Sequence, residues 1–583
     1  MTPRYEAPSR AISGTDADLL DQLRYADGRP YGFYKNALGA WDYGDFTLAI
    51  DHVQADPYAP PSSLRAWSTP EAMGLPEAAL ASSDARLAAA DFIARSFDEA
   101  IRARGARDVS IARAGALILQ RSYATVLPDR VEVRFQVKLP ARGRSILGKS
   151  AARLFDVDVP NIVMDCFDFV SEDPDTTRKR SRLLGHVAAY EDYRALQGIL
   201  EERGWVSFVA DEALLARRSG VSETPLTGDG VVAFGAPESL RATVTLPHAG
   251  DVSGMAIPPG LTLIVGGGYH GKSTLLEAIA QGVYAHIPGD GRELVATDPT
   301  ATKVRAADGR AVTGVDISPF ITHLPGGADT TSFSTENASG STSQAASIIE
   351  SLELGARTLL IDEDTSATNL LIRDTRMRDL VAAEKEPITP LVDRVTSLTE
   401  AGVSLIMVVG GSGAFLDAAD RVLMMDNYRC LDVTSRAREV VAELPRPRTD
   451  APTSWEAAPR VPAAKARVDR PRTKASGTSV LTIDRSTVDI SDVAAVVDPG
   501  QAEAIAWCVR GVLEEMAGKQ SMPDLMAKLG RRLASEGLDA VCKFGARSYP
   551  AFLARPRLID VGAAINRYRG LSLREPRGEV SES

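Results

Sequence analysis

The chain has 583 residues, of which 44% are hydrophobic and 25% are charged, and its formal net charge is −11. This length exceeds a single hydrophobic core and predicts two to four globular domains. The acidic balance argues against a protein that coats nucleic acid with its whole surface, so any such contact needs local basic patches. No apolar run approaches the roughly 20 residues of a membrane span, and residues 1–16 lack a secretory signal, so we expect a cytoplasmic protein without a membrane partner.

The first block, residues 1–247, is predicted to be an α+β domain and a candidate for RNA binding. Residues 131–139 alternate strictly between apolar and polar side chains, which is the pattern of a half-buried strand with one polar face. Basic residues on this strand and in the runs that follow would neutralise phosphates. These candidates are Arg134, Lys138, Arg142, Arg144, Lys149, Arg178, Lys179 and Arg180. Such charge runs are more often solvated surface, and the sequence does not place them in space.

The second block, residues 248–443, has the pattern of an α/β layer covered on both faces. Apolar runs at 261–265, 358–361 and 403–409 alternate with helical or loop segments. Continuous apolar runs of this kind are typical of strands buried in a parallel sheet. We therefore expect a P-loop nucleotide-binding core here, if the loops between the strands carry phosphate-binding residues.

The loop after the run 261–265 reads Gly-Gly-Gly-Tyr-His-Gly-Lys-Ser, and a helical segment follows it. This is the G-x-x-x-x-G-K-[ST] pattern in its strand–loop–helix setting, where backbone amides and a helix N-terminus face a phosphate. Lys272 is expected to neutralise the β- and γ-phosphates, and Ser273 to ligate Mg²⁺. The residues predicted to contact ATP are Gly266, Gly267, Gly268, Tyr269, His270, Gly271, Lys272, Ser273 and Thr274.

The run 358–361 ends in two acidic residues, Asp362 and Glu363. Acids at a strand end are the usual partners of a P-loop, because they hold Mg²⁺ and orient or deprotonate the attacking water. We therefore predict that Asp362 is a metal ligand and that Glu363 is the catalytic base. Without a P-loop nearby, the same pattern would only be a buried strand that ends in surface acids.

Residues 338–342, Ala-Ser-Gly-Ser-Thr, resemble the LSGGQ signature of ATP-binding cassettes, and Ser339 lies 23 residues before Asp362, at that family's spacing. The resemblance implies that Ser339, Gly340, Ser341 and Thr342 contact the γ-phosphate across a dimer. A helix N-terminus suits that role. The segment after Glu363 keeps the Ser-Ala of a cassette D-loop but ends in Asn369, which would hydrogen-bond across the dimer.

Two cassette residues are missing. The strand 403–409 leads into Gly-Gly-Ser-Gly where cassettes usually place a switch histidine, and residues 316–320 lack the usual Q-loop glutamine. Ser412 would touch the γ-phosphate in place of the histidine but cannot act as it does. Slow turnover is therefore expected.

These departures together resemble one stand-alone family, the "predicted ATPase of the ABC class". The resemblance rests on the segments 54–57, 266–276, 287–293, 316–321, 338–344, 361–369, 372–374, 409–413 and 565–569. It implies a homodimer with an N-terminal domain, a central ABC-type ATPase core and a C-terminal domain, and it implies binding of ATP, Mg²⁺ and RNA, the last most simply as single strands.

The chain after the ATPase core divides into two parts. Residues 444–478 are rich in Pro, Ala, Arg and Lys and are predicted to be a flexible basic linker. Residues 479–583 are predicted to be a mainly helical C-terminal domain, with amphipathic helices over 502–516 and 522–533.

Two functional hypotheses remain after the sequence is considered. The first is a homodimeric, ATP-gated RNA-binding ATPase. The second is an ABC-type ATPase that acts on DNA or on a protein or ribosome partner. A kinase is a third reading because a P-loop serves many chemistries, but the signature-like segment argues against it.

Overall fold

A computed structural model describes residues 12–220, 222–324, 326–381, 385–444, 453, 455, 459–464, 468, 471–543 and 552–574. The chain divides into two compact units. The first comprises Met1–Glu191 with Arg547–Arg555, and the second comprises Asp192–Ala546 with Pro556–Ser583. None of the helices in the described ranges combines the length and apolar composition that a bilayer crossing requires.

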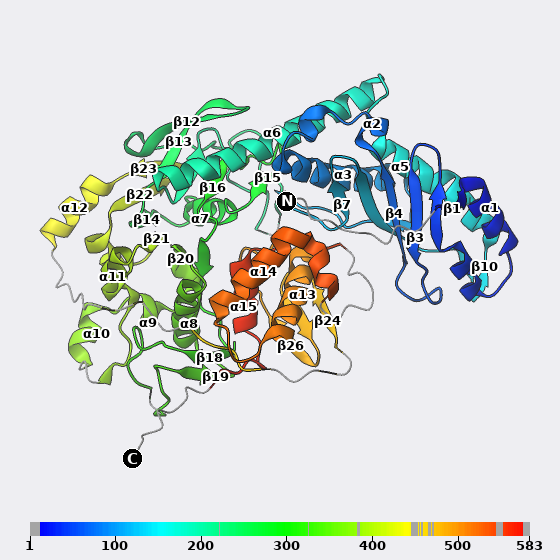
Figure 1. Ribbon diagram of the computed structural model, residues 1–583. Coiled ribbons are helices and arrows are strands. Elements are labelled where there is room, and N and C mark those ends of the chain that lie inside the picture. The colour runs from blue at the N-terminus through cyan, green and yellow to red at the C-terminus, as the bar shows by residue number, and fades with distance from the viewer. Residues whose placement is uncertain are drawn as a thin grey trace, which may run out of the picture. The chain divides into compact units, whose positions relative to one another are not determined.

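The first unit is built on a seven-stranded sheet with the order β1-β2-β3-β4-β8-β5, in which β7 also pairs with β8 (Figure 1). Its strands are β1 (Ile12–Thr15), β2 (Gly39–Asp42), β3 (Thr47–His52), β4 (Ser62–Ser68), β5 (Val109–Ser110), β7 (Ala124–Val126) and β8 (Val131–Val137). The main helices are α1 (Asp16–Tyr25), α3 (Ser83–Arg104), α5 (Val159–Phe167) and α6 (Pro174–Arg203), the last of which continues into the second unit. A short hairpin, β9 (Ala141–Arg142) and β10 (Ser145–Ile146), follows β8.

The predicted strand at 131–139 is β8, but its polar face differs from the expectation. Glu132 is only 5% exposed, because Arg65, Arg130 and Arg134 surround its carboxylate. Burial opposes ionisation, yet these guanidinium groups hold the pKa of Glu132 below its usual value. The part of this face around Glu132 is therefore a paired charge cluster and not a solvated surface, whereas Lys138 is exposed.

The second unit contains a six-stranded sheet with the order β17-β20-β21-β14-β22-β23. Its strands are β14 (Leu261–Val265), β17 (Thr302–Val304), β20 (Thr358–Asp362), β21 (Ser404–Val408), β22 (Arg421–Asp426) and β23 (Arg429–Asp432). All neighbours are parallel except the hairpin of β22 and β23. The helices α7 (Lys272–Gln281) and α8 (Gly340–Glu353) begin at the P-loop and at the signature-like segment. The five parallel strands bring their carboxyl ends to one edge of the sheet.

A second, antiparallel sheet of this unit has the order β12-β13-β11-β16. It comprises β11 (Ser207–Ala210), β12 (Arg241–Leu246), β13 (Gly250–Ile257) and β16 (Val295–Thr297). The predicted domain boundary at residue 247 falls inside this sheet, whereas the compact unit begins at Asp192. The predicted and observed boundaries differ because the alternation of apolar and polar residues identifies a short strand but does not show which sheet the strand joins.

The C-terminal region begins with a three-stranded antiparallel sheet of β24 (Thr473–Ser476), β25 (Val480–Ile483) and β26 (Ser486–Asp489). The helices α13 (Pro499–Glu515), α14 (Met522–Glu536) and α15 (Leu558–Asn566) follow, so the region is helical as predicted apart from these strands. About half of the predicted linker 444–478 lies outside the described residues, and its end forms β24.

Candidate functional site

The carboxyl ends of β14, β20 and β21 bring the predicted catalytic residues together. Glu363 directly follows β20, and its Oε2 accepts hydrogen bonds from the backbone amides of Gly410 at 2.6 Å and Gly411 at 2.9 Å. Lys272 opens α7, and its ammonium donates to the carbonyls of Gly266 and Gly267, both at 2.8 Å. A Cβ placed on Gly410 would lie 3.9 Å from both Lys272 Nζ and Glu363 Oε2. The lysine and the carboxylate therefore face one small space.

The backbone of the P-loop requires glycine at two of its positions. Gly266 has φ +137°, and an added Cβ would approach the carbonyl oxygen of Met425 to 2.4 Å. Gly271 has φ +97°, and an added Cβ would come within 2.7 Å of the Tyr428 ring. Tyr269 also has a positive φ of 64° and its side chain is fully exposed. These glycines allow the backbone conformation in which the amides of a P-loop can bind an anionic ligand.

The turn between β22 and β23 supports the P-loop from the side. The backbone amide of Asn427 donates to His270 Nδ1 at 3.1 Å, and that of Tyr428 donates to the carbonyl of His270 at 3.0 Å. Both turn residues have positive φ, the conformation of a two-residue hairpin turn, which is unusual for a tyrosine. Sequence reasoning missed Asn427 and Tyr428, although the Asp-Asn that ends the strand pattern was a turn signal.

Asp362 and Ser273 provide oxygen ligands of the kind that Mg²⁺ prefers. Asp362 is 5% exposed at the end of β20, and its Oδ1 accepts one hydrogen bond, from the amide of Asp364 at 3.2 Å. Ser273 is exposed in the first turn of α7, and no hydrogen bond of its hydroxyl occurs among the described residues. A buried carboxylate and a free hydroxyl near a P-loop fit a magnesium site.

The signature-like segment forms the N-terminus of α8. Ser339 is the N-cap residue, and its hydroxyl lies 3.1 Å from that of Thr342. Within the described part of the chain, no hydrogen bond or ion pair joins this turn to the P-loop. Ser341 Oγ donates to Asn369 Oδ1 at 2.8 Å, which places Asn369 beside the turn of its own chain.

Buried Gln344 connects α8 to the acidic strand end. Its amide nitrogen donates to Ser366 Oγ at 3.0 Å, and its carbonyl oxygen accepts from the amide of Ala367 at 2.8 Å. Ser366 Oγ in turn donates to the carbonyl of Asp362 at 2.8 Å. Ser412, by contrast, caps the short helix that begins at Gly413, because its hydroxyl accepts from the amide of Ala414 at 3.2 Å.

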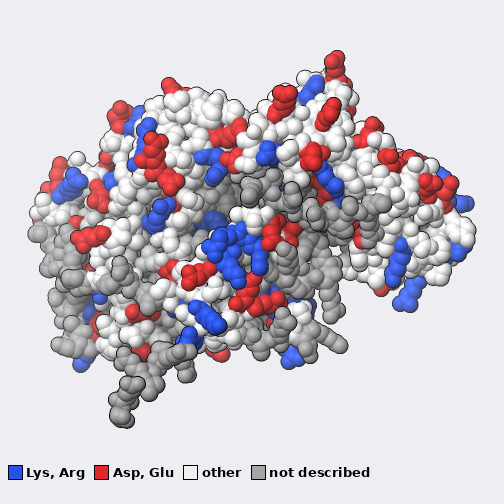
Figure 2. Space-filling model, in the orientation of Figure 1, with Lys and Arg blue, Asp and Glu red and all other residues white. Residues whose placement is uncertain are grey.

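The eight basic candidates of the first unit divide into two groups. The first group is engaged within the chain: Arg134 pairs with Glu132, Arg178 with Asp175, Lys179 donates to the carbonyl of Asp165, and Arg180 donates to that of Phe169. The second group, Lys138, Arg142, Arg144 and Lys149, is exposed and makes no side-chain hydrogen bond or ion pair with any described residue. Figure 2 shows both basic and acidic side chains on the face in view.

The fold and the strand-end site define a P-loop ATPase core of the ABC type, joined to accessory regions. Three family descriptions match successive parts of the chain: "ATPase of the ABC class N-terminal" over residues 16–169, the P-loop domain of ABC_ATPase over 179–460, and "MRB1590 C-terminal domain" over 472–574. The chain therefore belongs to the stand-alone ABC-class ATPases with accessory domains.

One curated relative is the "Uncharacterized protein MJ1628" of Methanocaldococcus jannaschii, which is 30% identical over 249 residues. That match covers 41% of this chain and 54% of the relative, so the chain spans about half of the relative's length.

Two solved structures are also similar. One is cbiO1 from Clostridium perfringens, part of the ABC transporter complex cbiONQ, with 16% identity, a TM-score of 0.25, and 42% of this chain and 97% of that chain covered. The other is the ADP conformation of MJ1267, an ATP-binding cassette of an ABC transporter, with 12% identity, a TM-score of 0.24, and 41% and 96% covered. TM-scores this low support no conclusion about this chain.

Proposed function

We propose that this protein is a magnesium-dependent ATPase that acts as a homodimeric, ATP-gated RNA-binding protein. The observation that carries the enzymatic part is the convergence of Lys272, Glu363 and the Gly410–Gly411 amides on one space at the strand ends. A cation for the phosphates and a base for water are the two groups that phosphoryl transfer to water requires.

The residues have distinct roles in this proposal. The amides of the loop 266–271 and the N-terminus of α7 bind the phosphates, and Lys272 exchanges its carbonyl partners for phosphate oxygens. Glu363 accepts a proton from the attacking water through Oε1, since the glycine amides hold Oε2. Ser273 and Asp362 would hold Mg²⁺, which when bound neutralises charge on the phosphate oxygens. Ser412 supplies a hydroxyl near the γ-phosphate but no proton carrier, which supports slow turnover.

The proposed dimer is supported by the exposed turn at Ser339, which makes no hydrogen bond or ion pair with the P-loop in the described residues. The turn at Ser339 begins a helix and is exposed, while Ser341 and Thr342 lie just beneath it. We infer that this helix N-terminus meets the γ-phosphate bound to a second copy of the chain, so that two ATP molecules hold two subunits together. ATP then drives closure by its differential affinity for the closed state.

RNA binding rests on the exposed cations of the first unit. Arg142 and Arg144 belong to the β9–β10 hairpin, which the amide of Tyr31 joins by donating to the carbonyl of Arg144 at 2.9 Å. Two residues before Tyr31, the Arg29 guanidinium lies 4.1 Å from the ring centroid of Tyr25, whose side chain is 67% exposed. An exposed aromatic ring and exposed cations suit single-stranded nucleic acid, whose bases stack and whose phosphates need charge.

The experiment is filter binding of single-stranded RNA at low salt, with and without ATP, for the wild type and Glu363→Gln. We expect binding that changes with ATP and a nucleotide-bound state that persists in the variant. Duplex DNA and ribosome pelleting are run in parallel. Absence of RNA binding in every nucleotide state, together with binding of DNA or ribosomes, would favour the alternative of an ABC ATPase with another partner.

A further inference from the structure

The segment 565–569, Ile-Asn-Arg-Tyr-Arg, comprises the last two residues of α15 and the three that follow, and it has no role in the site described above. Its polar side chains each reach a different part of the second unit. Asn566 Oδ1 accepts from the guanidinium of Arg460 at 2.9 Å, and Arg567 binds both carboxylate oxygens of Asp492, with Nε at 2.7 Å. Arg569, although exposed, donates to the carbonyls of Glu336 at 2.6 Å and Gly309 at 3.0 Å.

The two carbonyls that Arg569 contacts belong to the backbone that sets the signature-like turn. Gly309 donates its amide to the carbonyl of Ala338 at 2.8 Å, and Ala338 donates its amide to the carbonyl of Arg310 at 3.0 Å. Ala338 is buried and immediately precedes Ser339, the N-cap of α8. Arg569 therefore holds both the turn at Gly309, whose amide binds the carbonyl of Ala338, and the residue two positions before Ala338.

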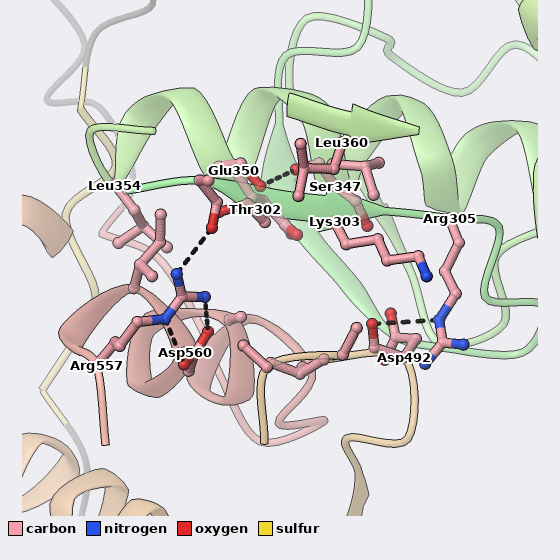
Figure 3. Close-up of a pocket in the computed structure, with 18 of the residues that line it drawn as sticks. Thr302, Lys303, Arg305, Ser347, Glu350, Leu354, Leu360, Asp492, Arg557 and Asp560 are labelled. Atoms are coloured by element: carbon pink, nitrogen blue, oxygen red, sulfur yellow. Dashed lines mark hydrogen bonds and ion pairs between the residues drawn. The ribbon is translucent and has the colours of Figure 1, made fainter. Parts of the chain in front are cut away.

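The rest of α8 is also held by charged groups. Buried Arg310 donates to Ser343 O and Ser347 Oγ, both at 3.1 Å, and to Glu350 at 2.8 Å. Near the end of the helix, Arg460 Nε donates to Glu353 at 2.9 Å. Figure 3 shows the cavity of about 40 Å³ between α8 and α15, where Glu350 and Ser347 face the side of the C-terminal region that carries Asp492 and Asp560. The helix is thus fixed at its middle and far end, Asn369 and Ser366 hold its first turns from one side, and Arg569 holds the backbone that leads into its N-terminus.

We propose that Arg569 is a positioning residue for the ATPase reaction, through which the C-terminal region holds the Ser339 turn in the orientation that meets the partner's γ-phosphate. This inference rests on the proposed function. Arg569 does not touch nucleotide, and the P-loop of its own subunit lies outside its contacts. Loss of the guanidinium would leave binding of ATP to the open subunit unchanged while weakening the step in which two subunits close.

The test compares Arg569→Ala and Arg569→Lys with Arg574→Ala. Arg574 is a matched control because its guanidinium also donates to a backbone carbonyl, that of Gly518 at 3.2 Å, away from the Ser339 turn. Calorimetry measures MgATP binding, steady-state assays separate kcat from KM, and light scattering of each substitution in the Glu363→Gln background measures ATP-dependent dimerisation.

For Arg569→Ala we expect a fall of about 10-fold in kcat and in the dimer association constant, with the Kd for ATP within about twofold of wild type. Arg569→Lys should recover most of the loss, since an ammonium can donate to both carbonyls, and Arg574→Ala should match wild type. Equal kcat and dimerisation in Arg569→Ala and Arg574→Ala would overturn the inference while leaving the proposed function intact. A Glu363→Gln parent that never dimerises with ATP would overturn both.

Discussion

The nucleotide edge of the second unit and the basic segments of the first unit show how differently two kinds of sequence signal translate into structure. At the nucleotide edge, Lys272, Glu363 and Gly410 are far apart in sequence but lie around one space. In the first unit, cations from one stretch of sequence differ in their contacts. Arg178 pairs with Asp175 and Arg180 donates to the carbonyl of Phe169, whereas Arg142 and Arg144 make no side-chain hydrogen bond or ion pair with any described residue. Parallel strands place their ends together, whereas a run of charge imposes no geometry.

The largest effect should come from Lys272→Ala at the nucleotide edge. The variant removes the only flexible cation that contacts the P-loop carbonyls in the described structure, and phosphate binding loses its main compensating charge. We expect binding of MgATP to fall by about 100-fold or more, measured by calorimetry. Lys528→Ala, which removes a half-exposed ammonium of α14 that pairs with Glu515, should bind as wild type does. Normal nucleotide binding by Lys272→Ala would show that the strand ends do not form the site.

The next effect should be the loss of turnover in Glu363→Gln. The amide keeps an oxygen that can accept from Gly410 and Gly411 but cannot take a proton from water. We expect kcat to fall by about 100-fold or more, the scale of a lost general base, with ATP binding retained. Asp364→Asn, a neutralisation of the adjacent exposed acid, should change kcat little. A variant at position 363 that hydrolyses at the normal rate would remove Glu363 from the role of base.

The sequence predicted the nucleotide edge because its chemistry is tied to backbone patterns. An apolar strand, glycines and a lysine at fixed spacing specify the loop, and Asp362–Glu363 at a strand end specify its partners. The contact of the Asn427–Tyr428 turn with the P-loop was not predicted. It consists of hydrogen bonds from the backbone amides of the two turn residues to His270, and a turn sequence does not indicate which distant residue its amides will bind.

The antiparallel sheet around β11 and the burial of Glu132 escaped prediction for a related reason. Strand pairing and ion pairing over long sequence distances depend on the tertiary fold, as the contact of Glu132 with Arg65 illustrates. Local alternation identified β8 as a strand but could not distinguish a solvated polar face from one covered by arginines.

A smaller effect should separate the two groups of basic residues. The double variant Arg142→Ala/Arg144→Ala removes exposed cations, and we expect single-stranded RNA affinity to fall by about 10-fold at low salt. The slope of log K against log salt should also decrease by about 1.4, because each lost phosphate contact on a single strand is worth about 0.7. The matched double variant Arg178→Ala/Arg180→Ala removes cations already engaged by Asp175 and Phe169. If both variants lose RNA affinity equally, engagement within the chain does not decide which cations bind RNA.

The smallest effect should come from Ser412→Ala, at the position where cassettes usually carry a histidine. In the structure, the Ser412 hydroxyl accepts from the amide of Ala414, so its loss should cost about 1 kcal/mol of stability as a helix cap. If the hydroxyl also reaches the γ-phosphate, kcat should fall by about threefold with unchanged ATP binding, far less than for Glu363→Gln. Ser412→Thr keeps a hydroxyl and should retain both properties. Thermal unfolding measures the loss of stability, and steady-state kinetics on the same samples measure the loss of turnover. A loss of turnover as large as that of Glu363→Gln would mean that the Ser412 hydroxyl, together with the Glu363 carboxylate, governs the chemical step.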